Sequence, residues 1–454
     1  RLSKLINYQG YELWWMHYDS IYEEFCLPYT QYAGLLSYLK DFEKVYLFQP
    51  SHPYLFQYFL KAHNHQCIIL KRFRLRNLLP FPFGVFLQIV LSFFFLPWLV
   101  IKRPEIMLWA SDKFAPPHKC DFRMIFIYDE LKKKNINFIE FIRSMESWVT
   151  VLNHAWQRRR PVFYSAAIIY FLHSLAGLIS HSYKVVLESD NSEERFWFLI
   201  ATHYLSNLRG TVWSILVMKF VLQLIGVKVA IIPSACNRTF HEVLACKLNG
   251  IKIVGIQHAV IPEYAFVSDF MPEFDGNLQL SVDKYGLWSE YWKEYYLSHS
   301  KAYQPEQLYV SGPMRPLEKE IDSGEPTLFK NGSLKILFIS EQLAAPTEVM
   351  PHLLSLLSAK DFTLYLKFRP YRDGFENWLK ENQPDILKKV RIFRGTMQQA
   401  IAESDVVVGS HSTAVLEALA QLKPFVFFWT DKWGDYFGIK PLDVQGQFFA
   451  NRPE

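Results

Sequence analysis

Charged residues are scarce in this chain of 454 residues, making up 20% of it, whereas an average soluble domain has about 25%. Apolar residues supply 50% of the chain and aromatic residues 17%. This composition excludes an intrinsically disordered protein, and the absence of a periodic repeat excludes collagen and coiled coil. Long apolar runs are too few for a polytopic transporter.

Cysteine is also rare. The 5 cysteines lie far apart and form no Cys-x-x-Cys pair. This excludes a disulfide framework and a cysteine-based zinc site, and favours a reducing compartment. No secretory signal opens the chain. Because the first residue is Arg rather than Met, we expect an incomplete N-terminus.

The excess of positive charge is small, with 49 basic and 44 acidic residues and a net charge of +5. Such a mild excess fits contact with an anionic membrane surface and predicts no nucleic-acid partner. Arg158, Arg159 and Arg160 form the densest basic run. We interpret this run as a solvated turn rather than a phosphate-binding patch.

One apolar run, Pro80–Ile101, contains no charged residue and is long enough to span a bilayer. Three prolines interrupt it, and basic residues flank both ends: Lys71, Arg72, Arg74 and Arg76 before it, Lys102 and Arg103 after it. Because positive flanks stay on the cytoplasmic side, a shallow membrane insertion suits both ends better than a span. A true span and a buried core helix remain alternatives.

Apolar strands alternate with helices twice along the chain, which predicts two parallel, doubly wound α/β domains. We expect an N-terminal domain at 1–320, a linker at 321–332 and a C-terminal domain at 333–454. The last of these is expected to be truncated, because it lacks a closing helix. The N-terminal domain includes the apolar insertion 80–101 and a helical region at 161–225. Its first predicted buried strands are Lys44–Phe48 and Cys67–Leu70.

The predicted strands of the larger sheets are continuous apolar runs, as is typical of strands buried on both faces. In the N-terminal domain they are Ile106–Ala110, Asn137–Phe141, Val227–Ile232, Lys252–Ile256, Tyr285–Trp288 and Gln307–Val310. In the C-terminal domain they are Leu334–Ile339, Phe362–Phe368, Val390–Phe393, Val406–Gly409, Phe425–Trp429 and Phe448–Phe449.

The segment Ser404–Phe428 carries the clearest candidate site. A buried strand ends at Gly409, the hydroxyl residues Ser410, Ser412 and Thr413 follow, and a helix begins. Free backbone N–H groups at a helix start bind phosphate, and hydroxyl groups add donors. Glu417 lies one turn further along the same face, where its carboxylate can accept hydrogen bonds from ribose hydroxyls. A plain capped helix with an exposed glutamate is an equal alternative on spacing alone.

This segment resembles the donor-nucleotide motif of GT-B glycosyltransferases, especially bacterial capsule and lipopolysaccharide transferases, and also that of CDP-glycerol glycerophosphotransferases. Leu308–Pro316, Lys252–Val260 and Leu287–Leu297 are similar to further segments of these families, in the same order. The resemblance covers about residues 227 to 430. It implies a GT-B-like fold, with two Rossmann-like domains facing a cleft and the nucleotide held by the C-terminal domain.

The resemblance also assigns roles to single residues. His258 is the candidate general base, since histidine exchanges protons near neutral pH. His411 is expected to orient phosphate rather than to act as base. Arg369 replaces a histidine common in the family and can bind phosphate in bidentate fashion.

Four further residues complete the expected cleft. Gln342 follows the first strand of the C-terminal domain and is expected on the donor side. Arg238, Gln257 and Arg315 are expected to line the acceptor side. Ala259 stands where the family usually has glycine, which is a departure from its pattern.

The resulting prediction is a glycosyltransferase that moves a sugar from a nucleotide-activated donor to a membrane-associated glycan or lipid acceptor. Bacterial surface polysaccharide synthesis at the cytoplasmic face of the inner membrane is the expected setting. No cofactor and no metal ion are expected, as the resemblance implies. A CDP-alditol polyol-phosphate transferase, a sugar-nucleotide 2-epimerase and a catalytically degenerate membrane scaffold are the alternatives.

Overall fold

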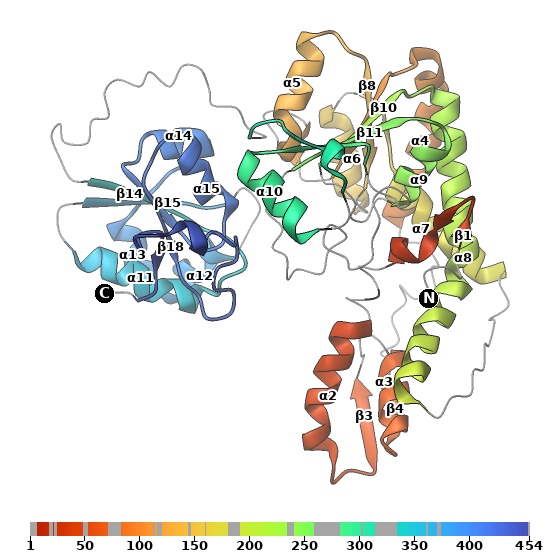
Figure 1. Ribbon diagram of the computed structural model, residues 1–454, viewed down its shortest axis with the longest axis horizontal. Coiled ribbons are helices and arrows are strands. Elements are labelled where there is room, and N and C mark those ends of the chain that lie inside the picture. Colours follow the sequence, from red (N-terminus) through yellow and green to blue (C-terminus); the bar gives the residue numbers. More distant parts are fainter. Residues whose placement is uncertain are drawn as a thin grey trace. The chain divides into compact units, whose positions relative to one another are not determined.

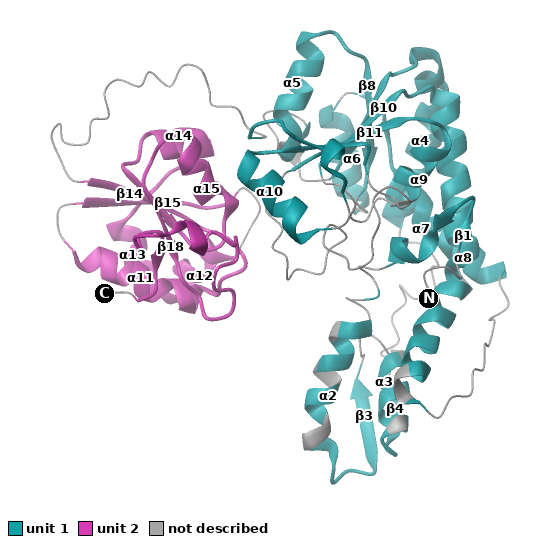
Figure 2. Ribbon diagram, viewed as in Figure 1, with its two compact units in different colours: residues 1–258, 265–314 teal, residues 259–264, 315–454 magenta. Residues whose placement is uncertain are grey.

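The computed structural model describes residues 7–17, 21, 25–48, 53–70, 83–111, 114–115, 120–143, 147–158, 160–179, 191–233, 240–257, 282–300, 303–313, 334–359, 362–369 and 374–452. The chain divides into two compact units (Figure 2). Unit 1 comprises Arg1–His258 and Ala265–Met314, and unit 2 comprises Ala259–Tyr264 and Arg315–Glu454. The predicted linker at 321–332 lies outside the described residues.

Unit 2 is built on a parallel sheet of 6 strands in the order β16-β15-β14-β17-β18-β19 (Figure 1). All of its strands lie within a residue or two of their predicted positions. Their bounds are β14 (Leu334–Ile339), β15 (Phe362–Lys367), β16 (Arg391–Ile392), β17 (Val406–Gly409), β18 (Phe425–Phe428) and β19 (Phe449–Ala450).

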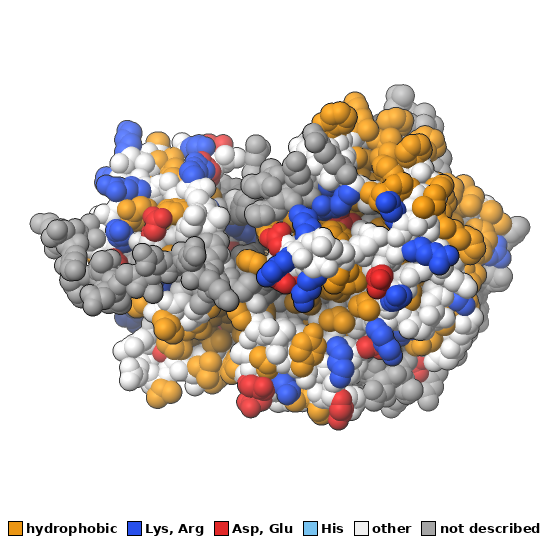
Figure 3. Space-filling model, turned by 90° about the horizontal axis from the view of Figure 1, so that it is seen from above, with side chains coloured by type: hydrophobic (Ala, Val, Ile, Leu, Met, Phe, Trp, Pro, Cys, Tyr) orange, Lys and Arg blue, Asp and Glu red, His pale blue; other side chains and the backbone are white. Residues whose placement is uncertain are grey.

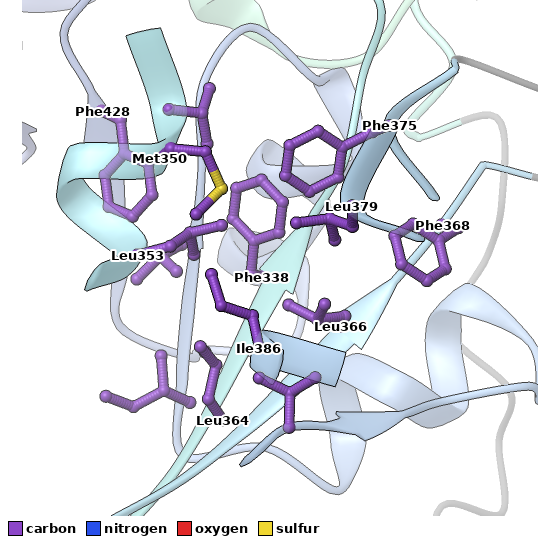
Figure 4. Packing of buried hydrophobic residues seen from close by; sticks show 14 of the residues in the cluster. Phe338, Met350, Leu353, Leu364, Leu366, Phe368, Phe375, Leu379, Ile386 and Phe428 are labelled. Carbon is purple, nitrogen blue, oxygen red and sulfur yellow. The ribbon is translucent and has the colours of Figure 1, made fainter. Parts of the chain in front are cut away.

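Three helices pack on one face of this sheet: α11 (Pro346–Ser358), α12 (Phe375–Asn382) and α13 (Pro384–Lys389). Figure 4 shows how Phe338 and Leu366 from the strands meet Leu353 and Phe375 from these helices. The helices α14 (Met397–Ala402) and α15 (Thr413–Ala420) contribute nothing to this core, and α15 contacts β17 and β18 instead. The sheet is therefore doubly wound.

Unit 1 is built on a parallel sheet of 7 strands in the order β13-β12-β11-β10-β5-β8-β9. Their bounds are β5 (Ile106–Ala110), β8 (Phe138–Ile142), β9 (Val162–Phe163), β10 (Val229–Ile232), β11 (Lys252–Ile256), β12 (Lys284–Leu287) and β13 (Leu308–Val310). The prediction of two parallel α/β domains is thus confirmed. Strand β9 was not predicted, because its residues merge with the apolar run that follows.

Helices cover the unit 1 sheet, and two of them, α7 (Ser165–Ile179) and α8 (Ser192–Ile225), lie within residues 161–225. The apolar insertion forms helix α4 (Phe83–Lys102), which shares one core with α5 (Ile125–Lys133), α6 (Trp148–Arg158) and α7. The remaining helices are α9 (Phe240–Leu248) and α10 (Glu290–His299). Helix α8 packs against both α7 and α9.

The N-terminal strands were predicted in the right place but with the wrong burial. β3 (Lys44–Phe48) and β4 (Gln66–Leu70) pair with each other as a separate parallel sheet of two strands. β4 packs against α3 (Pro53–Ala62), which in turn contacts α2 (Leu27–Leu39). Tyr46 is 62% and Phe48 70% exposed, so β3 is not a buried strand.

A buried carboxylate, Glu140, lies in the middle of β8. Its Oε1 atom accepts a hydrogen bond of 2.5 Å from the Tyr128 hydroxyl, and its Oε2 atom accepts one of 2.5 Å from Arg160 Nε. Arg158 Nε lies 3.9 Å from the same Oε2 atom. The interpretation of Arg158–Arg160 as a solvated turn is therefore wrong for these two arginines. They neutralise a charge that has no access to water.

Replacing Glu140 with Gln should lower the free energy of unfolding by about 3 kcal/mol or more, because it leaves buried guanidinium groups without a counter-charge. Urea unfolding followed by tryptophan fluorescence measures this change. Glu105→Gln is the control in the same unit, since the ion pair of Glu105 with Lys228 is mostly exposed and contributes at most about 1 kcal/mol. Equal losses for both variants would contradict the role given to Glu140.

Candidate functional site

The carboxyl ends of four unit 2 strands meet at one level of the sheet. Ile339 at the end of β14 pairs with Lys367 of β15 on one side and with Gly409 of β17 on the other. Gly409 in turn pairs with Phe427 of β18. The loops that follow these strands therefore start side by side.

Strand order reverses between β14 and β17. From β14 the chain proceeds to β15 and β16 on one side, then returns to place β17, β18 and β19 on the other. In open parallel sheets, ligands bind outside the carboxyl ends of the strands at such a reversal. The Ser410–Glu417 segment follows β17, so it starts at this point.

A buried hydrogen bond joins the two loops at the reversal. The Ser410 hydroxyl donates to Glu341 Oε1 over 2.7 Å. The same carboxylate accepts from the backbone N–H groups of Leu343 and Ala344. Ser410 is 1% exposed. Its hydroxyl therefore positions the loops from within, where a nucleotide has no direct access to it.

His411 is also held inside the protein. Its Nε2 atom forms a hydrogen bond of 2.7 Å with the Thr430 hydroxyl, and its ring centroid lies 5.5 Å from that of Tyr436. Burial lowers the pKa of His411 to about 4, although Glu348 opposes this shift. The imidazole is therefore neutral at pH 7 and carries no positive charge toward a phosphate.

The partly exposed residues of this segment lie at the start of α15. Ser412 is its N-cap, and the Ser412 hydroxyl accepts from the Ala414 N–H over 3.3 Å. Ser412, Thr413 and Glu417 are half-buried. The Val415 N–H donates to the Ser412 carbonyl oxygen over 3.0 Å. The donors at this edge are therefore the Ser412 and Thr413 hydroxyls at the positive end of the helix dipole, with one carboxylate a turn away, which suits a phosphate group next to a ribose.

Gly409 lets α15 start this close to the sheet. A Cβ atom at Gly409 would lie 2.8 Å from Val415 Cγ2 and 3.0 Å from the Ile339 carbonyl oxygen. Any larger residue would therefore push Val415, and with it the start of α15, away from the end of β14. The start of α15 is thereby held against the end of β14.

Two further predicted residues lie at the same end of the sheet. Arg369 is half-buried and follows β15 after Phe368, and Gln342 is exposed in the loop after β14. Strand order places Arg369 one strand away from the reversal. It thus lies at the edge where a guanidinium can reach an anion.

The remaining predicted residues are mostly beyond what the structure describes. His258 and Arg238 of unit 1 and Arg315 of unit 2 lie outside the described residues. Gln257 is fully buried at the end of β11. Its side-chain oxygen accepts from the Trp288 N–H over 2.9 Å, and its backbone oxygen accepts from Trp288 Nε1 over 2.6 Å. Gln257 therefore anchors the chain just before His258.

Unit 1 holds another buried carboxyl that sequence reasoning missed. Glu242 lies in the first turn of α9, after β10, and is 2% exposed. Burial raises its pKa to about 7, and the Ser165 hydroxyl, the Arg143 guanidinium and the Trp109 indole oppose that shift. These groups come from β5 and from the ends of β8 and β9. An acidic residue in the first turn of an apolar helix was the available signal.

Glu242 also lies where the unit 1 strand order reverses. β5 leads to β8 and β9 on one side, and β10 returns to the other side of β5. A carboxyl group with a pKa near 7 at such a position is suited to proton exchange. Its burial, however, places it behind the surface that a substrate would touch.

In the described part of the chain, no group of three or more His, Cys, Asp or Glu side chains is arranged to hold a metal ion. Cys26, Cys67, Cys120 and Cys246 are free thiols.

No protein-family model matches this chain, and no curated protein matches its sequence. Solved structures resemble it only distantly. Anabaena HepE in complex with UDP and glucose shares 14% identity at a TM-score of 0.42, over 77% of this chain and 86% of its own. A glycosyltransferase from Rickettsia africae shares 14% identity at a TM-score of 0.41, over 71% of this chain and 78% of its own.

A UDP-GlcNAc 2-epimerase from Neisseria meningitidis, solved with UDP-GlcNAc bound, shares 13% identity at a TM-score of 0.40, over 71% of this chain and 81% of its own. Similarities of this size do not transfer a substrate or a residue's role to this chain.

The buried carboxyl of Glu242 makes stability depend on pH. The pKa of Glu242 is raised from 4.5 to about 7 in the folded chain. Its contribution to the free energy of unfolding is therefore fully present below pH 4.5 and is lost as pH rises through 7. Because Glu242→Gln cannot lose a proton, its free energy of unfolding should rise relative to that of the wild type by about 3 kcal/mol between pH 4 and pH 8.

Urea unfolding at a series of pH values measures this difference, with Glu130→Gln on the exposed surface of α5 as the control. A difference between Glu242→Gln and the wild type that stays constant over this range would contradict a carboxyl that is protonated in the folded protein.

Proposed function

We propose that this protein is a glycosyltransferase that transfers a sugar from a nucleotide-activated donor to a membrane-associated glycan or lipid acceptor. The observation that carries the proposal is the start of α15 at the strand reversal of unit 2. There, the Ser412 and Thr413 hydroxyls lie at the first turn of the helix, and the Glu417 carboxylate lies one turn further along. This set of groups suits a nucleoside diphosphate.

The donor would bind with its phosphates at Ser412 and Thr413 and its ribose at Glu417. The N–H groups at the helix start favour negative charge. They would therefore stabilise the nucleoside diphosphate as it leaves the anomeric carbon. Arg369 would add a guanidinium beside the phosphates.

His258 would act as the general base of the transfer. As the acceptor hydroxyl attacks the anomeric carbon, its proton passes to the imidazole and the bond from that carbon to the diphosphate breaks. Gln257, fixed by two hydrogen bonds to Trp288, would hold the backbone before His258 in place.

A sugar-nucleotide 2-epimerase would use the same donor groups, and remains the second candidate. The apolar surface of α4 favours the transferase, because five of its aromatic side chains are exposed: Phe83, Phe86, Phe93, Phe94 and Trp98. A membrane-associated acceptor explains such a surface, whereas a soluble nucleotide sugar requires none.

Nucleotide binding tests the donor site. The wild type should show a rise in melting temperature with at least one of UDP, CMP, CDP and GDP, equivalent to about 2.7 kcal/mol at a hundredfold excess over Kd. Glu417→Gln should weaken the best nucleotide about tenfold by removing a charged hydrogen-bond acceptor. Glu403→Gln, exposed on the same unit, is the control. If none of these four nucleotides stabilised the protein, the proposal of a donor site would be wrong.

Sugar transfer tests the base. His258→Ala should bind the same nucleotide with unchanged affinity while turnover falls about 100- to 10,000-fold. His299→Ala, at the exposed end of α10, is the matched control. Turnover is measured as release of the free nucleotide in the presence of acceptor. A variant at His258 with wild-type turnover would exclude this residue as the base.

A further inference from the structure

Helix α4 has one face packed into unit 1 and one face directed outward. The inner face consists of Gly84, Val85, Gln88, Ser92 and Leu99. The outward residues recur at helical spacing and are strongly exposed: Phe83 60%, Phe86 58%, Val90 45%, Phe93 52%, Phe94 73%, Trp98 44% and Ile101 79%. They form one apolar stripe along the helix.

Helix α6 continues this stripe. It packs beside α4, and the ring centroid of Trp148 lies 6.3 Å from that of Phe83. Its own exposed residues also share one side of the helix: Trp148 49%, Val149 56%, Leu152 47% and Trp156 78%. We call the exposed apolar residues of both helices the α4–α6 face.

The α4–α6 face is too large for ordinary surface exposure. Side chains of this size have areas of about 150 to 250 Å² each, and about half of each is exposed, which gives on the order of 1,000 Å². A monomeric soluble protein rarely exposes a continuous apolar patch above a few hundred Å². Figure 3 shows hydrophobic side chains gathered along one side of unit 1.

The inner face of α4 decides how it can meet a membrane. The Ser92 hydroxyl donates to the Gln88 carbonyl over 2.8 Å and accepts from the Tyr164 N–H over 2.9 Å. Gln88 and Ser92 are fully buried, and Val85 belongs to the unit 1 core. Although α4 is long and apolar enough to span a bilayer, its inner face packs against α6, α7, α8 and β9 of the same unit. A position in the plane of the membrane surface keeps these contacts, whereas a span would break them.

The charge of the α4–α6 face favours lipid over protein. Neither helix contains an acidic residue. Lys102 Nζ lies 5.6 Å from the centre of the Trp98 ring at the end of α4, and Arg103 follows. Tryptophan and basic residues together are typical of segments at an anionic membrane interface.

We propose that the α4–α6 face is an in-plane docking surface for an anionic lipid bilayer, and that α6 supplies half of it. This inference deepens the proposed function, since it names the surface that would bring the enzyme to a membrane-associated acceptor. Leu152 and Trp156 of α6 enter the interface together with Phe94 and Ile101 of α4. The polar side of α6, with Asn153 and Gln157, stays in water.

Vesicle co-sedimentation of the full chain tests the proposal. Vesicles of phosphatidylcholine with 30% phosphatidylglycerol, on the order of the anionic content of natural leaflets, should bind the wild type more tightly than pure phosphatidylcholine. Leu152→Ser with Trp156→Ser, and separately Phe94→Ser with Ile101→Ser, should each weaken binding about tenfold or more. The control is Leu422→Ser with Val444→Ser, which changes apolar residues of unit 2 that are 92% and 90% exposed.

Three results would overturn this assignment. The wild type would fail to bind either vesicle, or the α6 pair would bind as tightly as the wild type, or sedimentation equilibrium would show a dimer that both pairs dissociate. Because all four substituted residues are exposed, the variants should fold, and unchanged circular dichroism checks this. Nucleotide stabilisation is measured on the same variants and should be unchanged, so failure of membrane docking and failure of the donor site are distinguishable.

Discussion

The hydrogen bond from Ser410 to Glu341 holds together the two strand ends on which the candidate donor site depends. It links the loop after β14 with the loop after β17, where strand order reverses. Gly409 then allows α15 to begin directly beside that bond. The start of α15 is thus held by its close contact with the end of β14 and by the buried Glu341 carboxylate. A rigid edge of this kind can present N–H groups without reorganising on binding.

Unit 1 also has a parallel sheet with a reversal of strand order, but its buried carboxyl groups have different roles. Glu140 is neutralised by arginines and serves the core, whereas Glu242 is buried with a raised pKa at the strand reversal. The unit also carries the α4–α6 face on its helical layer. The two units therefore divide the proposed tasks. Unit 2 would bind the nucleotide at the start of α15, and unit 1 carries both the Glu242 carboxyl and the apolar α4–α6 face.

Much of this fold was predictable because strands of parallel sheets are continuous apolar runs. All six strands of unit 2 were predicted from such runs, and the start of α15 was predicted from Gly409, Ser412 and Thr413. What sequence could not predict were contacts between distant residues. Ser410 and Glu341 are 69 positions apart, and Arg160 and Glu140 are 20 apart. The exposure of α6 was missed because its apolar stripe is short and mixed with polar residues.

The central claim is that a nucleotide binds at the start of α15. Hydrogen–deuterium exchange of the full chain, with and without the nucleotide that stabilises it best, tests this claim most directly. The account predicts slower exchange of the amides at 410–415 and 340–345, with little change in β16 and α13. Protection confined to other parts of the chain, with none at the start of α15, would contradict it.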